Sequence, residues 1–221
     1  PLALDLANWG IHNIDALNWL AVPPNAPLAQ GQDLLKLLGA LDAQGRISAH
    51  GREMATLPMH PRLAHMVVRG GKLGLADLAC NVAALLTDRD IAQREGPGEI
   101  PADLNLRLAA LKGERTSLRI NQNALSRTKA LAKQLMRRTQ KKMTPDADLD
   151  ISADERVGAL IALAYPDRIA ERRTGGEARF RLSNGKGAAL SSADALHNAP
   201  YIAIAVVTGD NRDAHIRLAA P

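Results

Sequence analysis

Residues 34–68 of the chain read LLKLLGALDAQGRISAHGREMATLPMHPRLAHMVV. The apolar start of this segment predicts a helix that ends at Gly39, and residues 41–45 predict a tight turn into a short extended piece over 46–48. A second small helix is expected next, and the prolines at 58 and 61 frame a further helical start. Helix, tight turn, short strand and helix is the pattern of a winged helix, which here continues into a helical bundle.

The rest of the chain divides into two regions with different apolar spacing. Residues 58–150 read as helices rich in Ala and Leu, including a long amphipathic helix expected over 115–143. After Pro166 the spacing changes to that of about five short strands separated by Gly and Asn turn residues, which favours a small barrel of the OB type. The sequence therefore predicts an α+β multidomain fold, with a winged-helix-like domain over 1–57, a helical bundle over 58–150 and an OB-like β-barrel over 151–221.

Composition and charge limit the possible partners. Hydrophobic residues make up 46% of the 221 residues but aromatic residues only 2%, so the core must be aliphatic and a surface that stacks many bases is disfavoured. The net charge of +5 and the isoelectric point of about 9.7 favour anionic partners, although ordinary solvated surfaces could give the same balance. Cys80 is the single cysteine, which excludes an internal disulfide and favours a reducing cytoplasm, and we expect it to be buried as a small apolar residue. No apolar run approaches the roughly 20 residues of a membrane span, so no membrane partner is expected.

The long helix expected over 115–143 carries a basic face. Lys133, Arg137 and Lys141 recur every four residues and fall on the side opposite the apolar positions of the helix. Such a face could follow a phosphate backbone. A solvated helix surface with no partner is the alternative.

The predicted strands contain a second group of basic residues. Within about 20 residues the chain places Arg168, Arg172, Arg173, Arg179, Arg181 and Lys186. Arg179 and Arg181 alternate with Phe180, so their side chains are expected on the same face of one strand. A barrel strand with one basic face is suited to single-stranded nucleic acid, because phosphate contacts give affinity without reading sequence. Solvent-facing arginines beside an inward Phe180 are the alternative.

The motifs of a motor or a metal site are not found. A nucleotide-hydrolysing loop needs Gly-x-x-x-x-Gly-Lys followed by Ser or Thr, and neither Gly-Lys pair, at 71–72 and 185–186, is so followed. We therefore expect no catalytic residue and no cofactor within this chain. His60 and His65 lie five residues apart, which does not suit a zinc-binding helix, and no metal site is predicted. Asp88-Arg89-Asp90 is expected to end a helix through local ion pairs.

Three motifs together resemble one protein family. They are residues 41–47 with 50–55, then Leu-Pro-Met-His-Pro-Arg-Leu-Ala-His-Met at 57–66, and Ala-Leu-Ala-Tyr-Pro-Asp-Arg-Ile-Ala at 162–170. The first two resemble the helicase-associated region of DEAH-box proteins, and the third is similar to the bacterial HrpB-type ATP-dependent RNA helicases. The resemblance implies a winged helix, a helical ratchet bundle and an OB-like domain packed against two RecA-like motor domains. It also implies that the motor domains, with their ATP and Mg²⁺, belong to a longer parent chain in a bacterial cytoplasm.

These observations lead to one main hypothesis and two alternatives. The main hypothesis is an accessory C-terminal part of an ATP-dependent RNA helicase that binds and guides single-stranded RNA beside its own motor domains. The first alternative is a protein–protein interaction platform for helicase regulators. The second is a winged-helix DNA-binding module over residues 30–57, which has only three basic residues, Lys36, Arg46 and Arg52, to contact DNA.

Overall fold

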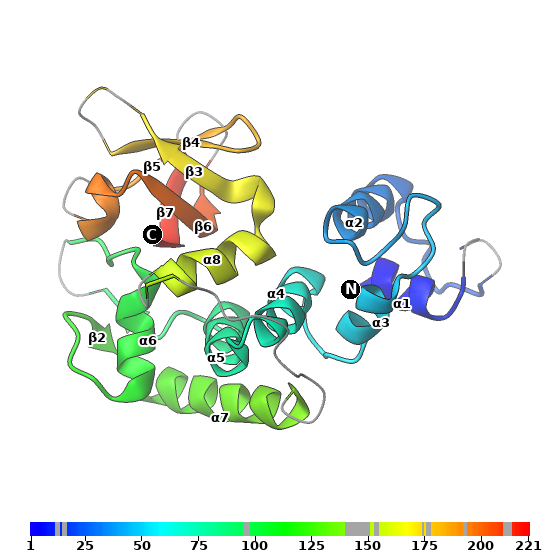
Figure 1. Cartoon of the computed structure of the whole chain (residues 1–221), viewed down its shortest axis with the longest axis horizontal. Helices are drawn as coiled ribbons and strands as arrows, with labels where there is room; N and C mark the ends of the chain where they lie inside the picture. The colour runs from blue at the N-terminus through cyan, green and yellow to red at the C-terminus, as the bar shows by residue number, and fades with distance from the viewer. Residues whose placement is uncertain are drawn as a thin grey trace. The chain divides into compact units, whose positions relative to one another are not determined.

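The computed structural model describes residues 1–11, 14, 17–94, 98–139, 151–152, 155–173, 175, 178–191, 194–209 and 214–221. The chain forms two compact units, Pro1–Val68 and Arg69–Pro221, each of which can be followed in Figure 1. They are described here one at a time. The three-part division expected from the sequence, 1–57, 58–150 and 151–221, stays a prediction.

The first unit contains the winged helix. Its helices are α1 (Leu2–Asn8), α2 (Asn25–Leu37), α3 (Ala49–Ala55) and the start of α4 (Pro61–Lys72). Between α2 and α3, Leu41 and Ile47 form an isolated antiparallel bridge, which is the small wing. The Oδ1 atom of Asp42 closes the turn by accepting the N–H groups of Gln44 and Arg46 at 3.0 and 2.8 Å. These hydrogen bonds, with that from the Arg46 N–H first, lower the pKa of Asp42.

Ser48 joins the wing to helix α3. Its hydroxyl accepts the N–H of Gly51 at 2.9 Å, which caps the helix, and donates to the carbonyl of Gly39 at 2.7 Å. Gly39 itself has a φ of 68°, so the chain can leave α2 where the sequence predicts the helix to end. Helix, turn, strand and helix therefore follow one another as the sequence predicts.

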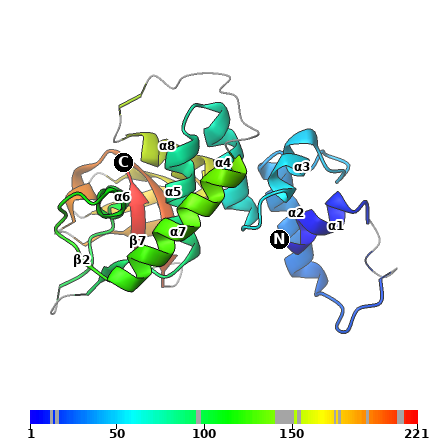
Figure 2. The same ribbon diagram turned by 90° about the horizontal axis from the view of Figure 1, so that it is seen from below.

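The second unit begins with a group of helices. These are the end of α4, then α5 (Ala76–Thr87), α6 (Leu104–Lys112), α7 (Gln122–Thr139) and α8 (Glu155–Ala164). Figure 2 shows α7 running alongside α5. The contact is made from small residues, because α5 buries Ala79, Cys80 and Ala83 and α7 buries residues at three- and four-residue steps, namely Ala124, Thr128, Ala132, Leu135 and Thr139.

The prediction of a long helix over 115–143 is wrong at the N-terminal end of the helix. Residues Arg119–Ile120 form strand β2, which pairs with β1 (Ala92–Gln93), so the helix cannot begin before them. Asn121 then caps α7, because its side-chain oxygen accepts the N–H of Ala124 at 3.0 Å. Residues 140–143 lie outside the described part of the chain.

The five predicted strands close into a barrel. They are β3 (Ile169–Arg172), β4 (Arg179–Leu182), β5 (Gly187–Ala189), β6 (Tyr201–Thr208) and β7 (Ala214–Ala220). The order around the barrel is β3-β4-β5-β7-β6, with β5 and β7 parallel and every other pair antiparallel. This is the strand order of an OB fold, so the predicted α+β fold class is confirmed.

The barrel is filled by aliphatic residues around a single aromatic ring. Phe180, Ile202, Ile204 and Ile216 are all at most 1% exposed. Helix α8 packs on the outside of β6 and β7 (Figure 1) and buries Ala203 and Ala205. The outer surface of β3 and β4 keeps exposed polar residues, as the alternating burial of β4 shows.

Two glycine-to-alanine substitutions in the first unit test the packing of the wing. Gly51→Ala should lower the free energy of unfolding of this unit by about 1–3 kcal/mol, because a Cβ at Gly51 would overlap the carbonyl oxygen of Ala40 and lie 2.8 Å from Cγ1 of Ile47. Gly31→Ala, also in a helix, is the matched control, since its Cβ would meet only Ala3 at 3.5 Å. Urea unfolding followed by tryptophan fluorescence is the measurement, because both tryptophans, Trp9 and Trp19, lie in this unit. Equal stabilities of the two variants would contradict the packing.

Candidate nucleic-acid interface

Helix α7 presents a basic surface. Between Gln122 and Thr139 the chain has no acidic residue, and its exposed side includes Arg127, Lys129, Lys133, Arg137 and Arg138. The helix is amphipathic because its small and apolar residues face α5 and leave the cationic side chains to solvent. Two of the three residues predicted for the basic face of this helix, Lys133 and Arg137, are exposed and lie one turn apart. Lys141, the third, lies outside the described residues.

One of the five cations on α7 has a carboxylate partner. Nε of Arg127 lies 3.0 Å from Oδ2 of Asp88, and both side chains are partly exposed. The N–H of Arg89 and then Arg127 lower the pKa of Asp88. Among the described residues, Lys129, Lys133, Arg137 and Arg138 form no ion pair. Their charge is therefore available to an anion from solution.

The barrel brings two of the predicted arginines together. Arg179 and Arg181 are exposed on the outer face of β4, while Phe180 between them points into the core. Nη2 of Arg181 lies 3.3 Å from Oε2 of Glu171 on the neighbouring strand β3, in an exposed ion pair. Exposed pairs of this kind are weak, at about 0–1 kcal/mol, so Arg181 can exchange its partner.

Arg168 and Arg172 make hydrogen bonds to other parts of the barrel domain. Arg168 donates from Nη1 to the carbonyl of Ala205 at 3.0 Å, and its guanidinium carbon lies 4.9 Å from the centre of the Tyr165 ring. Arg172 is paired in register with Phe180, so it points to the opposite side of β3 from Glu171, and its Nη1 donates to Oδ1 of Asn198 at 3.2 Å. These two arginines hold β3 against its neighbours.

The remaining predicted barrel residues lie in connections. Arg173 follows β3 and Lys186 precedes β5, and both are exposed. The crowding of the six basic residues in the sequence suggests one continuous basic surface. In the structure they do not form one. The structure places Arg179 and Arg181 on one face and separates the others from them.

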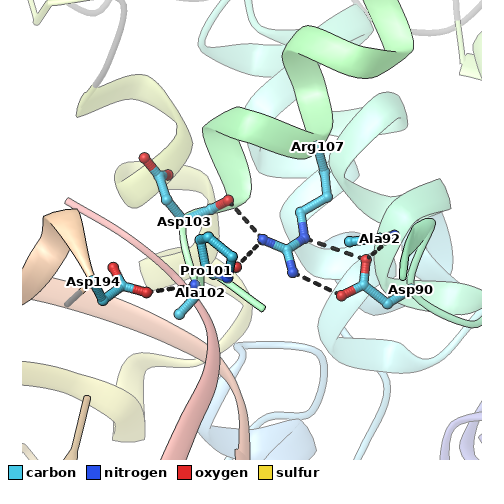
Figure 3. Close-up of polar contacts among 7 residues, drawn as sticks. All are labelled: Asp90, Ala92, Pro101, Ala102, Asp103, Arg107 and Asp194. Atoms are coloured by element: carbon cyan, nitrogen blue, oxygen red, sulfur yellow. Dashed lines mark hydrogen bonds and ion pairs between the residues drawn. The ribbon is translucent and has the colours of Figure 1, made fainter. Parts of the chain in front are cut away.

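An ion pair between the buried Arg107 and the partly exposed Asp90, which the sequence did not predict, lies in the region next to the barrel (Figure 3). Arg107 of α6 is only 1% exposed. Its Nη2 lies 2.8 Å from Oδ2 of Asp90 and its Nε lies 3.2 Å from Oδ1, while Nη1 donates to the carbonyls of Pro101 and Asp103. Asp90 was expected to make only local ion pairs. The signal that could have found its partner is an arginine at an apolar helical position, three residues after Leu104.

The segment 101–103 connects this ion pair to the barrel. Oδ2 of Asp194 accepts the N–H of Ala102 at 2.6 Å, and the carbonyl of Ala102 accepts the N–H of Ala219 on β7 at 3.0 Å. Figure 3 shows Arg107 on one side of the segment and Asp194 on the other. The segment before α6 therefore contacts Arg107 through its carbonyls and the barrel through Ala102, which links α6 to the barrel.

Asp103 begins helix α6 in the same network. Its Oδ1 accepts the N–H of Asn105 at 2.8 Å, which is an N-cap. Burial, which outweighs this hydrogen bond, raises the pKa of Asp103, and the nearby Asp194 carboxylate raises it further. The ionised side chain is therefore less favourable here than in the unfolded chain.

The cysteine and two of the histidines make contacts within the fold. Cys80 is fully buried, with Sγ 3.5 Å from Oγ1 of Thr139, and burial raises its pKa, which confirms the small apolar role. Nε2 of His50 and Nδ1 of His65 lie 2.8 Å apart in a hydrogen bond. Within the described ranges, no three His, Cys, Asp or Glu side chains are grouped to hold a metal ion. None of the described helices has the length and apolar character needed to cross a bilayer.

Comparison with known proteins identifies the family. Over 99% of its length the chain is 33% identical to the ATP-dependent RNA helicase HrpB of Escherichia coli. A crystal structure described as that of E. coli DExH-box NTPase HrpB matches all of the chain with a TM-score of 0.74 at 32% identity. The chain belongs to the HrpB-type family. It spans only 24% of the length of the E. coli relative.

Two further matches agree with the HrpB-type assignment. The family model described as helicase associated domain (HA2), winged-helix, matches residues 33–59, which include the wing and helix α3. The probable ATP-dependent RNA helicase DHR2 of Saccharomyces cerevisiae is 26% identical over 96 residues, 43% of the chain and 13% of DHR2. The chain, with its winged helix, helical region and barrel, thus matches about a quarter of a protein named an ATP-dependent RNA helicase.

The ion pair of the buried Arg107 in this HrpB-type region can be tested against the ion pair of the exposed Arg127. Asp90→Ala should lower the free energy of unfolding by about 1–3 kcal/mol, because it leaves the buried guanidinium of Arg107 without its carboxylate, although the partly exposed site of Asp90 admits water. Asp88→Ala, two residues away, removes the exposed pair with Arg127 and should cost less than about 1 kcal/mol. Urea unfolding followed by far-UV circular dichroism measures both. Similar losses in the two variants would show that the buried network does not hold the unit together.

The raised pKa of Asp103 predicts that the stability difference between Asp103→Asn and the wild type depends on pH. A carboxyl whose pKa is higher in the folded than in the unfolded chain binds its proton more tightly when folded, so its contribution to stability is present at low pH. That contribution is lost as the pH rises from 3.8, the ordinary value, through the raised one. Asp103→Asn keeps a capping oxygen and removes the charge.

The free energy of unfolding of Asp103→Asn, minus that of the wild type, should therefore grow as the pH increases across this window and then stay constant. Urea titrations at pH values between about 3 and 7 give this difference. A difference that falls with rising pH would contradict the assignment.

Proposed function

We propose that this chain is the accessory part of an ATP-dependent RNA helicase and that it binds and guides single-stranded RNA. In this proposal the ATP and Mg²⁺ are used by motor domains of a longer protein in a bacterial cytoplasm. These motor domains and single-stranded RNA are the two main partners, and a protein regulator is a further possible one. The relationship to the E. coli protein, whose name is ATP-dependent RNA helicase HrpB, supports this assignment.

The observation that carries the RNA-binding proposal is the basic surface of α7. It has five cations, no acidic residue and a single carboxylate contact, that of Arg127, within the described part of the chain. An extended polyanion can lie along such a helix, because each cation that neutralises a phosphate releases condensed counterions. The exposed Arg179 and Arg181 on the barrel supply a second cationic surface in the same compact unit.

The low aromatic content shapes the kind of recognition expected. With aromatic residues at only 2% of the chain, affinity must come mainly from phosphate contacts. Contacts to phosphates are independent of base sequence, which suits a helicase part that must let RNA slide through. Strong dependence on salt concentration follows directly.

A second candidate function, a protein-interaction platform, is favoured by one observation in the first unit. Large apolar side chains there are exposed, including Trp9 at 67%, Val22 at 62% and Leu37 at 60%. Exposed apolar side chains of this size suit a contact with another protein or with the motor domains. Binding that barely responds to salt would favour this function over RNA binding.

Charge reversal on α7 tests the proposed function. Lys133→Glu with Arg137→Glu should weaken binding of a fluorescein-labelled 12-nucleotide oligo(U) at least about tenfold at 50 mM salt. The slope of log K against log salt should fall by about 1.4, since two phosphate contacts are lost. Fluorescence anisotropy gives both quantities.

The control is Lys36→Glu with Arg52→Glu, which changes the net charge equally on exposed residues of the winged helix. Affinity should change much less in this variant. Equal effects of the two variants would point to net charge rather than to α7. No effect of the α7 variant would remove helix α7 from the RNA-binding surface.

A further inference from the structure

The outer face of the barrel carries an unusual group of exposed side chains. Among the described residues of Arg69–Pro221, only Ile169 and Tyr201 are large hydrophobic residues that are substantially exposed, at 40% and 59%. Both lie on the outer face, because Ile169 precedes the inward Ala170 and Tyr201 precedes the inward Ile202. We call Ile169, Glu171, Arg181 and Tyr201 the Tyr201 patch.

The strand register brings these residues together. Glu171 of β3 is directly opposite Arg181 of β4 and directly opposite Tyr201 of β6, so the three form a row across three strands. Ile169 lies two residues before Glu171 and is therefore diagonal to Tyr201. Arg181 has Gly187 as its partner on β5, so no side chain crowds it from that strand.

Helix α8 leaves this patch open. It covers the outer face of β6 at Ala203 and Ala205, which are 6% and 2% exposed. Two residues earlier, at Tyr201, the cover has ended, and the tyrosine ring is mostly exposed. Figure 1 shows α8 beside β6 and β7, whereas β4 and β5 lie on the side of the barrel away from it.

Glu171 holds the two flanking groups by weak contacts. Its Oε2 lies 3.3 Å from Nη2 of Arg181, and its Oε1 accepts the Tyr201 hydroxyl at 3.5 Å. The second distance is at the outer limit of a hydrogen bond, and the ion pair is exposed on both sides. A phosphate group can therefore replace Glu171 as the partner of Arg181 without leaving a buried charge.

We propose that the Tyr201 patch is a binding site for one nucleotide of single-stranded RNA, in which the base stacks on the Tyr201 ring beside Ile169 and Arg181 contacts the adjoining phosphate. This inference rests on the proposed function. The charge beside the patch favours a nucleotide over a protein partner, because the exposed face of β4 carries Arg181 within the patch and Arg179 two residues before it. Base–aromatic stacking also tolerates any base, as a guiding surface requires.

The test compares RNA with and without bases. For the 221-residue chain, Tyr201→Ala should weaken binding of a 12-nucleotide oligo(A) by about 5- to 100-fold, which is the usual effect of removing one stacking ring. Binding of an abasic 12-nucleotide backbone should not change, and Tyr201→Phe should bind oligo(A) like the wild type. Glu171→Gln should strengthen binding of both oligonucleotides, because Arg181 is released. Fluorescence anisotropy at 50 mM salt provides all these affinities.

The outcomes separate the site from the function on which it rests. If the wild type binds neither oligonucleotide, the proposed function and the site both fail. If the wild type binds oligo(A) and Tyr201→Ala binds it equally well, RNA binding stands and the site is overturned, which would leave the patch to a protein partner. Equal losses for oligo(A) and the abasic backbone would also overturn stacking, because such losses indicate a change in the fold or in phosphate contacts.

Discussion

The ion pair between the buried Arg107 and the partly exposed Asp90 is the interaction on which the junction of α5, α6 and the barrel depends. A guanidinium that is 1% exposed must keep its partners, and here they come from Asp90, which follows α5, and from the segment just before α6. The same segment hydrogen-bonds to Asp194 and to β7 of the barrel. This segment thus links α6 to the barrel, in addition to the packing of α8 on β6 and β7.

In the proposed function, the second unit presents cationic surfaces in fixed positions to a flexible polymer. The small residues of α7 pack on α5, so all its cations face outward from a helix whose position is fixed by the core. The barrel adds Arg179 and Arg181 on a strand whose inner side is anchored by Phe180. In the proposed function the motor of the longer protein supplies the work, and this unit supplies positions that stay in place while RNA moves.

The features that the sequence predicted well are those that neighbouring residues determine. The wing depends on Asp42 and on the glycines at 39 and 45, and the five strands depend on alternation and turn residues, so both could be recognised locally. The common face of Arg179 and Arg181 follows from the same two-residue period.

The features that it missed depend on contacts between distant residues. The true start of α7 depends on β2 pairing with a strand about 27 residues earlier in the chain. The partner of Asp90 lies on another helix, and the direction of Arg172 depends on its register with Phe180. Basic residues that are close in sequence were therefore taken as one surface, although the barrel distributes them over several. Tyr201 was overlooked for a related reason, because its exposure depends on where α8 ends.

Mapping the path of RNA on the chain tests the central claim most directly. Ultraviolet cross-linking of the 221-residue chain to 4-thiouridine RNA, followed by mass spectrometry, identifies the peptides that contact the polymer. The account predicts cross-linked peptides from α7, within Gln122–Thr139, and from the outer face of β3, β4 and β6. Cross-links confined to the winged helix, with none on α7 or the barrel, would contradict it.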